Sequence, residues 1–258
     1  MDIVFVSISA FLACILTFFS GFGLGTILAP VLMAFFSVEL AIAMTAVVHF
    51  FNNIYKLFLV GKYADKMVLV RFGIPAVIAA FLGSWLLIHI TDLKPLFQYS
   101  IFNTQFTVHP VNLIIALLLI IFAIMDLLPQ MEKIQFGPEK LTIGGLLSGF
   151  FGGLSGHQGA LRSAFLIKAG LSKQAFIGTA AVVSTFVDFT RLSVYSTHFS
   201  KAGLLDHIPL LLSAILSAIA GSYLGNILLQ KVTLQFVQKT VAILLLVLAV
   251  SLGLGWLQ

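Results

Sequence analysis

The sequence predicts an all-α integral membrane protein built from two homologous halves, and three observations carry this prediction. Of the 258 residues, 60% are hydrophobic and only 9% are charged, whereas soluble domains carry about 25% charged residues. The charges separate long apolar runs, each near the roughly 20 residues that a spanning helix needs. The segment 45–57 recurs as 180–192, with five of its thirteen positions identical. Such long runs exclude outer-membrane barrels, whose strands alternate over about 10 residues.

The expected elements of the first half follow in order from its apolar runs. Residues 3–38 form a run of 36 residues without a formal charge, which as one helix would extend about 54 Å against a hydrocarbon core of about 30 Å. The run must therefore break or turn. The weakest points are Gly21, Gly23, Gly25 and the following Pro30. Three spanning helices are then expected at about 39–60, 68–90 and 110–128.

The second half repeats this order, and we expect the two repeats at 1–130 and 131–258. Its broken segment covers about 141–170 and contains the glycine cluster from Gly149 to Gly159. A duplicated hydrophobic unit with glycine breaks at matching positions is typical of secondary transporters. Three further spans are expected at about 173–195, 206–230 and 236–257.

Positively charged loops distinguish two ways of relating the halves, because cytoplasmic loops are enriched in lysine and arginine. Lys62, Lys66 and Arg71 place the loop after the first span in the cytoplasm. If the segment 141–170 is re-entrant, four basic residues of the second half are also cytoplasmic; if it crosses the membrane, only two are. The count favours re-entrant segments and an inverted repeat. A parallel repeat of four-crossing halves is the alternative.

The second glycine cluster combines a backbone break with polar side chains inside an apolar run. A break exposes backbone N–H groups at the start of the next half-helix, and these attract anions. An arginine at this depth costs at least about 2.5 kcal/mol unless it has a partner, water or a ligand. The alternative is a packed kink with a structurally paired arginine. The predicted donor-rich substrate site contains Gly156, His157, Gln158, Gly159, Arg162 and Ser163.

The helix that follows each broken segment carries a polar stripe at positions i, i+4 and i+7. The first stripe is His49, Asn53 and Lys56, and the second is Ser184, Asp188 and Arg191. Such stripes on spanning helices face the interior or a water path. In the alternative interpretation, Lys56 and Arg191 reach lipid headgroups and Asp188 pairs with Arg191. The substrate-site prediction is completed by Gly23, Gly25, His49, Asn53, Asp188 and Arg191.

Several other sequence features argue against a cofactor, a nucleic-acid partner and an enzymatic activity. A single cysteine, Cys14, allows no disulfide framework, and the remaining histidines show no ligand spacing, so no metal or other cofactor is expected. Scattered basic residues are typical of topogenic loops and not of a nucleic-acid surface.

The motif Gly153–Gly156 fits the G-x-S-G pattern of rhomboid-like serine hydrolases, but the base nearest in sequence to Ser155, His157, is two residues away and is expected to point elsewhere. We therefore expect no enzyme. The aromatic-rich stretch 97–106 is expected to be an interfacial loop.

These motifs together resemble the TauE/SafE family of sulfite exporters, also called the 4-toluene sulfonate uptake permease (TSUP) family. The likeness rests on the glycine breaks, on Pro30 and on the duplicated Ala-Val-Val segments with their polar residues, and it covers nearly the entire chain. Family members show a glycine run followed by a proline in each half. Here His157, Gln158, Arg162 and Ser163 depart from that pattern in the second half.

The resemblance implies a multi-pass anion permease of the bacterial cytoplasmic (inner) membrane, and specifically an exporter. The implied substrate is a small sulfur-containing oxyanion such as sulfite or an organosulfonate, bound between the two broken segments near the membrane midplane. An anion channel is the alternative. The expected partners are this anion and the membrane lipids, with a homodimer as a further candidate and no nucleic acid.

Overall fold

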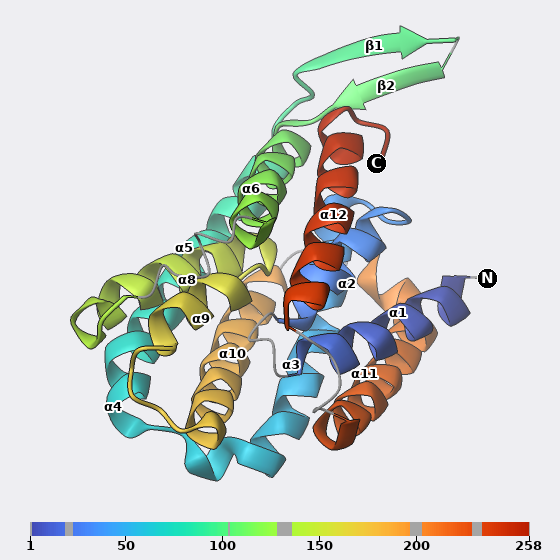
Figure 1. The fold of residues 1–258 in the computed structure, drawn as a ribbon. Helices are drawn as coiled ribbons and strands as arrows, with labels where there is room; N and C mark the ends of the chain where they lie inside the picture. The colour runs from blue at the N-terminus through green and yellow to red at the C-terminus, as the bar shows by residue number, and fades with distance from the viewer. Residues whose placement is uncertain are drawn as a thin grey trace.

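The computed structural model of the chain describes residues 2–18, 23–102, 104–127, 136–196, 203–228 and 234–257. The N-terminal part contains α1 (Asp2–Thr17), α2 (Leu24–Met33), α3 (Val38–Val60), α5 (Ile74–Thr91) and α6 (Pro110–Leu127). The C-terminal part contains α8 (Leu141–Ser155), α9 (Gly159–Leu166), α10 (Lys173–Tyr195), α11 (Ile208–Leu228) and α12 (Leu234–Gly253). Figure 1 shows these helices packed around a central pair, α3 and α10.

The helices match the apolar runs of the sequence. Four helical stretches in the described residues are long and apolar enough to cross a membrane: Val38–Tyr63, Lys66–Thr91, Lys173–Tyr195 and Leu204–Ile227. Shorter apolar helices cover Ile3–Thr17, Leu24–Met33, Pro110–Met125 and Ala242–Gly253. The chain is therefore a helical, multi-pass membrane protein.

The two central helices begin in the same way. The side chain of Ser37 accepts a hydrogen bond from the Leu40 backbone N–H at the start of α3, and Ser172 does the same for Ala175 at the start of α10. These N-caps satisfy one of the four free N–H groups of each helix. The two serines are also equivalent in the duplicated sequence, so the internal similarity extends to the capping residues.

Between α3 and α5 the chain turns back through short elements. A 3-10 turn (Gly61–Tyr63) is followed by α4 (Lys66–Val68), whose N-cap is the Asp65 side chain, and by a π-helical turn (Leu69–Gly73). Pro75 lies in the first turn of α5 and has no N–H to donate, which accounts for the widened turn before it. Similar 3-10 turns, Pro138–Lys140 and Leu204–His207, precede α8 and α11.

Glycines bring α8 and α5 into direct backbone contact. Cβ atoms built at Gly145, Gly149 and Gly153 would lie only 2.2, 1.9 and 2.2 Å from backbone carbonyl oxygens of α5 or the turn before it. This four-residue spacing is the small-xxx-small pattern that allows membrane helices to approach closely. On α11, Gly221 approaches the Phe11 carbonyl of α1 in the same way, at 2.3 Å. Thus α1 packs on α11 as α8 packs on α5.

Two further helix pairs are antiparallel. Gly178 near the start of α10 abuts the Val60 carbonyl at the end of α3, while Phe189 further along α10 stacks near Phe50. Gly253 at the end of α12 lies against Ala116 near the start of α6. Helix α3 therefore runs antiparallel to α10, and α6 runs antiparallel to α12.

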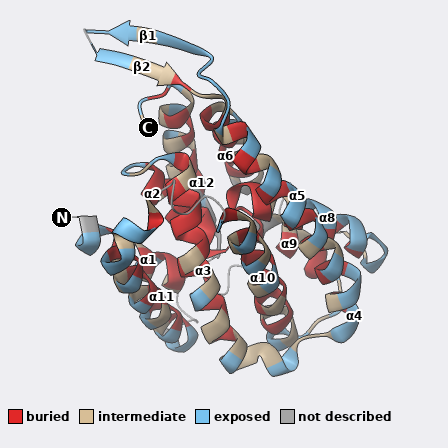
Figure 2. Cartoon of the chain, turned by 180° about the vertical axis from the view of Figure 1, so that it is seen from behind, coloured by how far each residue is buried: buried red, intermediate tan, exposed pale blue. Residues whose placement is uncertain are grey.

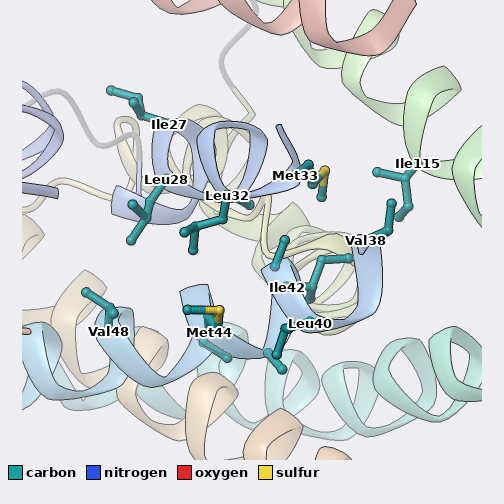
Figure 3. Packing of buried hydrophobic residues seen from close by; sticks show 14 of the residues in the cluster. Ile27, Leu28, Leu32, Met33, Val38, Leu40, Ile42, Met44, Val48 and Ile115 are labelled. Carbon is teal, nitrogen blue, oxygen red and sulfur yellow. The ribbon is translucent and has the colours of Figure 1, made fainter. Parts of the chain in front are cut away.

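The apolar core lies between these helices. Leu28 and Leu32 of α2 pack with Met44 and Val48 of α3 in a cluster that reaches Ile115 of α6 (Figure 3). Large hydrophobic residues such as Ile78, Phe81 and Trp85 are exposed, and Figure 2 shows exposed residues, in pale blue, on the outer faces of the helices. This distribution is expected where lipid, and not water, contacts the outer surface.

The stretch 97–106 was expected to be a loop, and this expectation is wrong. It forms an antiparallel hairpin of β1 (Phe97–Ile101) and β2 (Thr104–Val108), with Phe97 opposite Val108 and Tyr99 opposite Phe106. The aromatic residues that suggested an interface also favour strands. The hairpin lies at one end of the bundle, over α6 and α12 (Figure 1).

Candidate functional site

The site is organised around the end of α8. This helix ends at Ser155, and Gly156 then adopts a left-handed conformation with φ 80°, which a residue without a Cβ reaches at low cost. The last carbonyl groups of the helix have no partner within it, and one of them accepts hydrogen bonds from neighbouring helices. The Gly153 carbonyl accepts hydrogen bonds from the Tyr195 hydroxyl at 2.5 Å and the Ser84 hydroxyl at 3.3 Å, so neighbouring helices satisfy the break.

The first broken segment meets the second at two glycines. Gly21 and its neighbours at 19–22 lie outside the described residues, but Gly23 and Gly25 lie within them. A Cβ at Gly25 would lie 2.9 Å from the Gly156 carbonyl oxygen, and one at Gly23 would lie 3.2 Å from His49 Nε2. Side chains at these positions would therefore separate the segments or displace His49.

The two polar stripes meet at Asp188. His49 Nδ1 lies 2.6 Å from Asp188 Oδ2, and Asn53 Nδ2 donates to the same oxygen at 2.9 Å. Because a carboxylate only accepts, His49 Nδ1 carries the proton in this contact. Arg191 Nη2 lies 2.9 Å from Asp188 Oδ1, as an ion pair without hydrogen-bond geometry. The four side chains are buried, so one carboxylate connects α3 with α10.

A small cavity lies beside this cluster. Its volume is about 30 Å³, more than the roughly 10–15 Å³ that one water molecule requires. Arg162 of α9 lines it and donates to the Ser184 hydroxyl of α10. Of the predicted site residues, the cavity lining includes Gly23, His49, Asn53 and Arg162.

The cavity lining does not include the other predicted site residues. Asp188 and Arg191 lie behind His49 and Asn53, and Gly25 and Gly156 form the contact between the broken segments. Side-chain atoms of three further members have no hydrogen-bond partner among the described residues: His157 Nε2, both amide atoms of Gln158, and Ser163 Oγ. Gly159 begins α9.

Among the cavity-lining residues outside the predicted site are two residues of the polar stripes, Lys56 and Ser184. Both were recognised as stripe positions, and their spacing to Asn53 and Asp188 was the signal that could have included them. Lys56 Nζ lies 5.1 Å from the centre of the Phe18 ring, a cation–π contact, and the residue is 8% exposed. Lys56 therefore faces the protein interior and does not reach lipid headgroups.

The buried charges of this region do not balance. Among the described residues, the buried charged side chains are Lys56, Arg162, Arg191 and Asp188. With His49 neutral, three cations face one carboxylate, a formal excess of two positive charges. Within the described residues, this excess of positive charge would attract an anion.

The geometry around Ser155 differs from the sequence expectation. His157 does not point away, since its Nδ1 lies 3.3 Å from Ser155 Oγ. The same nitrogen lies 3.0 Å from the Ser155 carbonyl, which can only accept, so Nδ1 carries the proton and cannot act as the base for the serine. Within the described residues, no group of three or more His, Cys, Asp or Glu side chains could hold a metal ion.

Comparison with known proteins identifies the family. The family model described as "Sulfite exporter TauE/SafE" matches residues 6–252, nearly the whole chain. The chain belongs to the TauE/SafE family. No curated protein and no solved structure matches it. Members of the TauE/SafE family are membrane transporters and not enzymes, and the match includes both broken segments and the Asp188 cluster.

Proposed function

We propose that this TauE/SafE protein exports a small sulfur-containing oxyanion, such as sulfite or an organosulfonate, across the bacterial cytoplasmic membrane as a secondary transporter. The observation that carries the proposal is the excess of buried positive charge among the described residues of α3, α9 and α10. An anion of one or two negative charges would offset that excess. The substrate would bind near the midplane, in the cavity lined by Gly23 and Arg162.

The chemistry of the cavity suits an oxyanion. A guanidinium presents several donors in a planar fork that matches the oxygens of such an anion, and Arg162 lines the cavity. His49 turns Nε2 toward Gly23 on the same cavity, and Asn53 adds an amide. We assign Arg162 the main binding contact and His49 with Asp188 the coupling of protons, since intramembrane carboxylates and histidines form proton relays in transporters.

Alternating access would follow from an inverted repeat of 1–130 and 131–258. Equivalent helices run antiparallel in such a repeat and parallel in the alternative. The antiparallel pairs α3 with α10 and α6 with α12 support inversion. Both broken segments are then re-entrant. Cysteines introduced at Lys66 and Lys173 should be labelled only from the cytoplasm, and labelling of position 173 from outside would favour parallel halves.

The central test is the thermal stability of purified Arg162 variants with sulfite, sulfate, thiosulfate, sulfoacetate, taurine and carboxylate anions. A ligand at a hundredfold excess over its Kd stabilises the parent by about 2.7 kcal/mol. Arg162→Ala should lose this stabilisation while remaining folded. Arg162→Lys should bind poorly, because an ammonium cannot reproduce the fork.

Arg71→Ala is the matched control, because Arg71 is exposed. Full anion binding by Arg162→Ala would make Arg162 a structural residue, and the absence of any stabilising anion for the parent would contradict the proposal. Flux that saturates with anion concentration and responds to a pH gradient distinguishes a transporter from a channel.

A further inference from the structure

Lys56 and Arg191 are equivalent residues on antiparallel helices, so they lie at opposite ends of the central cluster. Along α3, Lys56 follows His49 and Asn53, at the level of the cavity. Along α10, Arg191 follows Asp188 and continues in the opposite direction. The contacts of His49 and Asn53 with Asp188 therefore separate two buried cations.

The guanidinium of Arg191 is buried beside Asp188 and retains hydrogen-bond donors without partners among the described residues. The side chain is 0% exposed, yet its Nε and Nη1 have no hydrogen-bond partner among the described residues. A Cβ at Gly156 would lie 2.8 Å from Nη1, and Gly25 lies between Gly156 and the Thr45 side chain. The Thr45 hydroxyl is also buried and without a partner in the described part of the chain.

We propose that Arg191 and Thr45, next to Gly156, form a second anion position on the opposite side of the His49–Asp188 contact from the Arg162 cavity. The inference rests on the proposed transport function. Arg191 does not line the cavity of Arg162 and Lys56, so the two positions are separate. The transported anion occupies the Arg162 position from the cytoplasmic side and the Arg191 position from the outer side. The contact between His49 and Asp188 opens as the anion passes.

The test measures anion flux in each direction in proteoliposomes whose protein orientation has been determined by impermeant labelling. Arg162→Gln should raise the half-saturating anion concentration on the cytoplasmic side, and Arg191→Gln should raise it on the outer side, each by about tenfold or more. Thr45→Val removes only the hydroxyl and should raise the half-saturating anion concentration on the outer side alone. This variant tests the second position if Arg191→Gln does not fold.

Other outcomes separate the two proposals. If both arginine variants raise the half-saturating concentration on the same side, or if Thr45→Val changes neither side, there is no second position. If the parent shows no anion flux, the proposed function itself fails. Arg191→Lys keeps the charge next to Asp188 and serves as the folded control.

A separate observation concerns the hairpin, which has one apolar and one polar face. Its pairing places Phe97, Tyr99, Ile101, Phe106 and Val108 on one face and Gln98, Ser100, Gln105 and Thr107 on the other. No residue from 95 to 108 is charged. Phe97 is 54%, Ile101 43% and Phe102 99% exposed. The apolar face is therefore only partly covered by protein: Val108 is 1% exposed, whereas Phe97 and Ile101 near the two ends of β1 are exposed.

That apolar face turns toward the helices. The Tyr99 hydroxyl donates to the Leu254 carbonyl at the end of α12, at 2.5 Å, and a Cβ at Gly255 would lie 3.5 Å from Val108. Beyond this contact the hairpin projects past the helix ends, as Figure 1 shows. Trp256, two residues after Leu254, is also exposed.

We infer that the hairpin lies on the bilayer with its apolar face in the boundary between headgroups and acyl chains, where aromatic side chains are favoured. The neighbouring residues Ile101 and Ser100 allow a matched test. Ile101→Trp and Ser100→Trp are each made in a protein carrying Trp85→Phe and Trp256→Phe, and reconstituted in phosphatidylcholine vesicles brominated near the headgroup.

Bromine should quench the fluorescence of the Ile101→Trp protein more strongly than that of the Ser100→Trp protein. Equal quenching, or none at position 101, would overturn the inference. Cross-linking between copies at position 101 without quenching would instead place a second chain on this face and would also overturn it.

Discussion

The polar stripes of α3 and α10 have the same spacing, but their charged side chains have different partners. On α10, Asp188 pairs with Arg191 on its own helix and accepts from His49 and Asn53 of the other. On α3, Lys56 forms no ion pair with a described residue and rests against the ring of Phe18. The two stripes therefore share their spacing but not their ionisable groups, and one carboxylate, Asp188, contacts side chains of both helices.

The comparison predicts that removing the Asp188 side chain lowers the free energy of unfolding more than removing the Asn53 side chain does. Asp188→Ala leaves a buried arginine without its anion, which should lower the free energy of unfolding by about 3–5 kcal/mol. Asn53→Ala removes one donor from a carboxylate that keeps two other partners, and should cost about 1–3 kcal/mol. Denaturant unfolding of the two purified variants provides the measurement. Similar losses would mean that the cluster does not depend on its carboxylate.

The second prediction compares the contact of α8 with α5 and the contact of α11 with α1, in each of which the two helices run parallel. A Cβ at Gly149 would lie 1.9 Å from the Ala76 carbonyl oxygen, whereas at Gly225 the nearest atom, Phe18 Cβ, is 3.2 Å away. Gly149→Ala should cost about 1–3 kcal/mol through overpacking against backbone. Gly225→Ala should change stability by less than about 1 kcal/mol, because improved helix propensity offsets a mild contact. A larger loss for Gly225→Ala would show that the α1 contact is the tighter one.

The third prediction exchanges the equivalent residues of the stripes. Asp188→Asn keeps the side-chain shape and makes the two halves alike, but it removes the only buried carboxylate among the described residues. We expect anion binding to be retained and the dependence of flux on a pH gradient to be lost. Asn53→Asp should lower expression more than it alters coupling. If Asp188→Asn proteoliposomes remain as gradient-sensitive as the parent, protons use another route, such as His49 or the substrate.

The smallest expected effect is that of Lys56. Lys56→Gln should weaken anion binding by about three- to tenfold, less than Arg162→Ala, because an ammonium acts as a point charge and not as a fork. Lys62→Gln is the control, since Lys62 is exposed and packs on Tyr63. Equal effects of the two variants on anion affinity would mean that Lys56 acts only through the general charge of the surface.

The sequence predicted the helices well, because hydropathy and charge alone determine which segments can lie in lipid. It also predicted the stripes, because i, i+4 and i+7 share one face of any helix. It indicated the pair of Asp188 with Arg191 as an alternative, and the structure contains this pair. It did not indicate that His49 and Asn53 converge on the same carboxylate, since this depends on the packing of α3 against α10. The hairpin at 97–108 was missed because aromatic residues favour both interfaces and strands.

The contact of α1 with α11 has a consequence for biosynthesis. Ser7 and Ser213 lie 2.6 Å apart between their hydroxyl oxygens although 206 positions separate them. Helix α1 therefore emerges from the ribosome long before its packing partner exists, whereas α8 finds α5 already made. Contacts of such long range form late and leave apolar or backbone surface uncovered in the meantime. A chain arrested before α11 would have α1 in the membrane without its neighbour, so assembly of the N-terminal half is completed only near the end of synthesis.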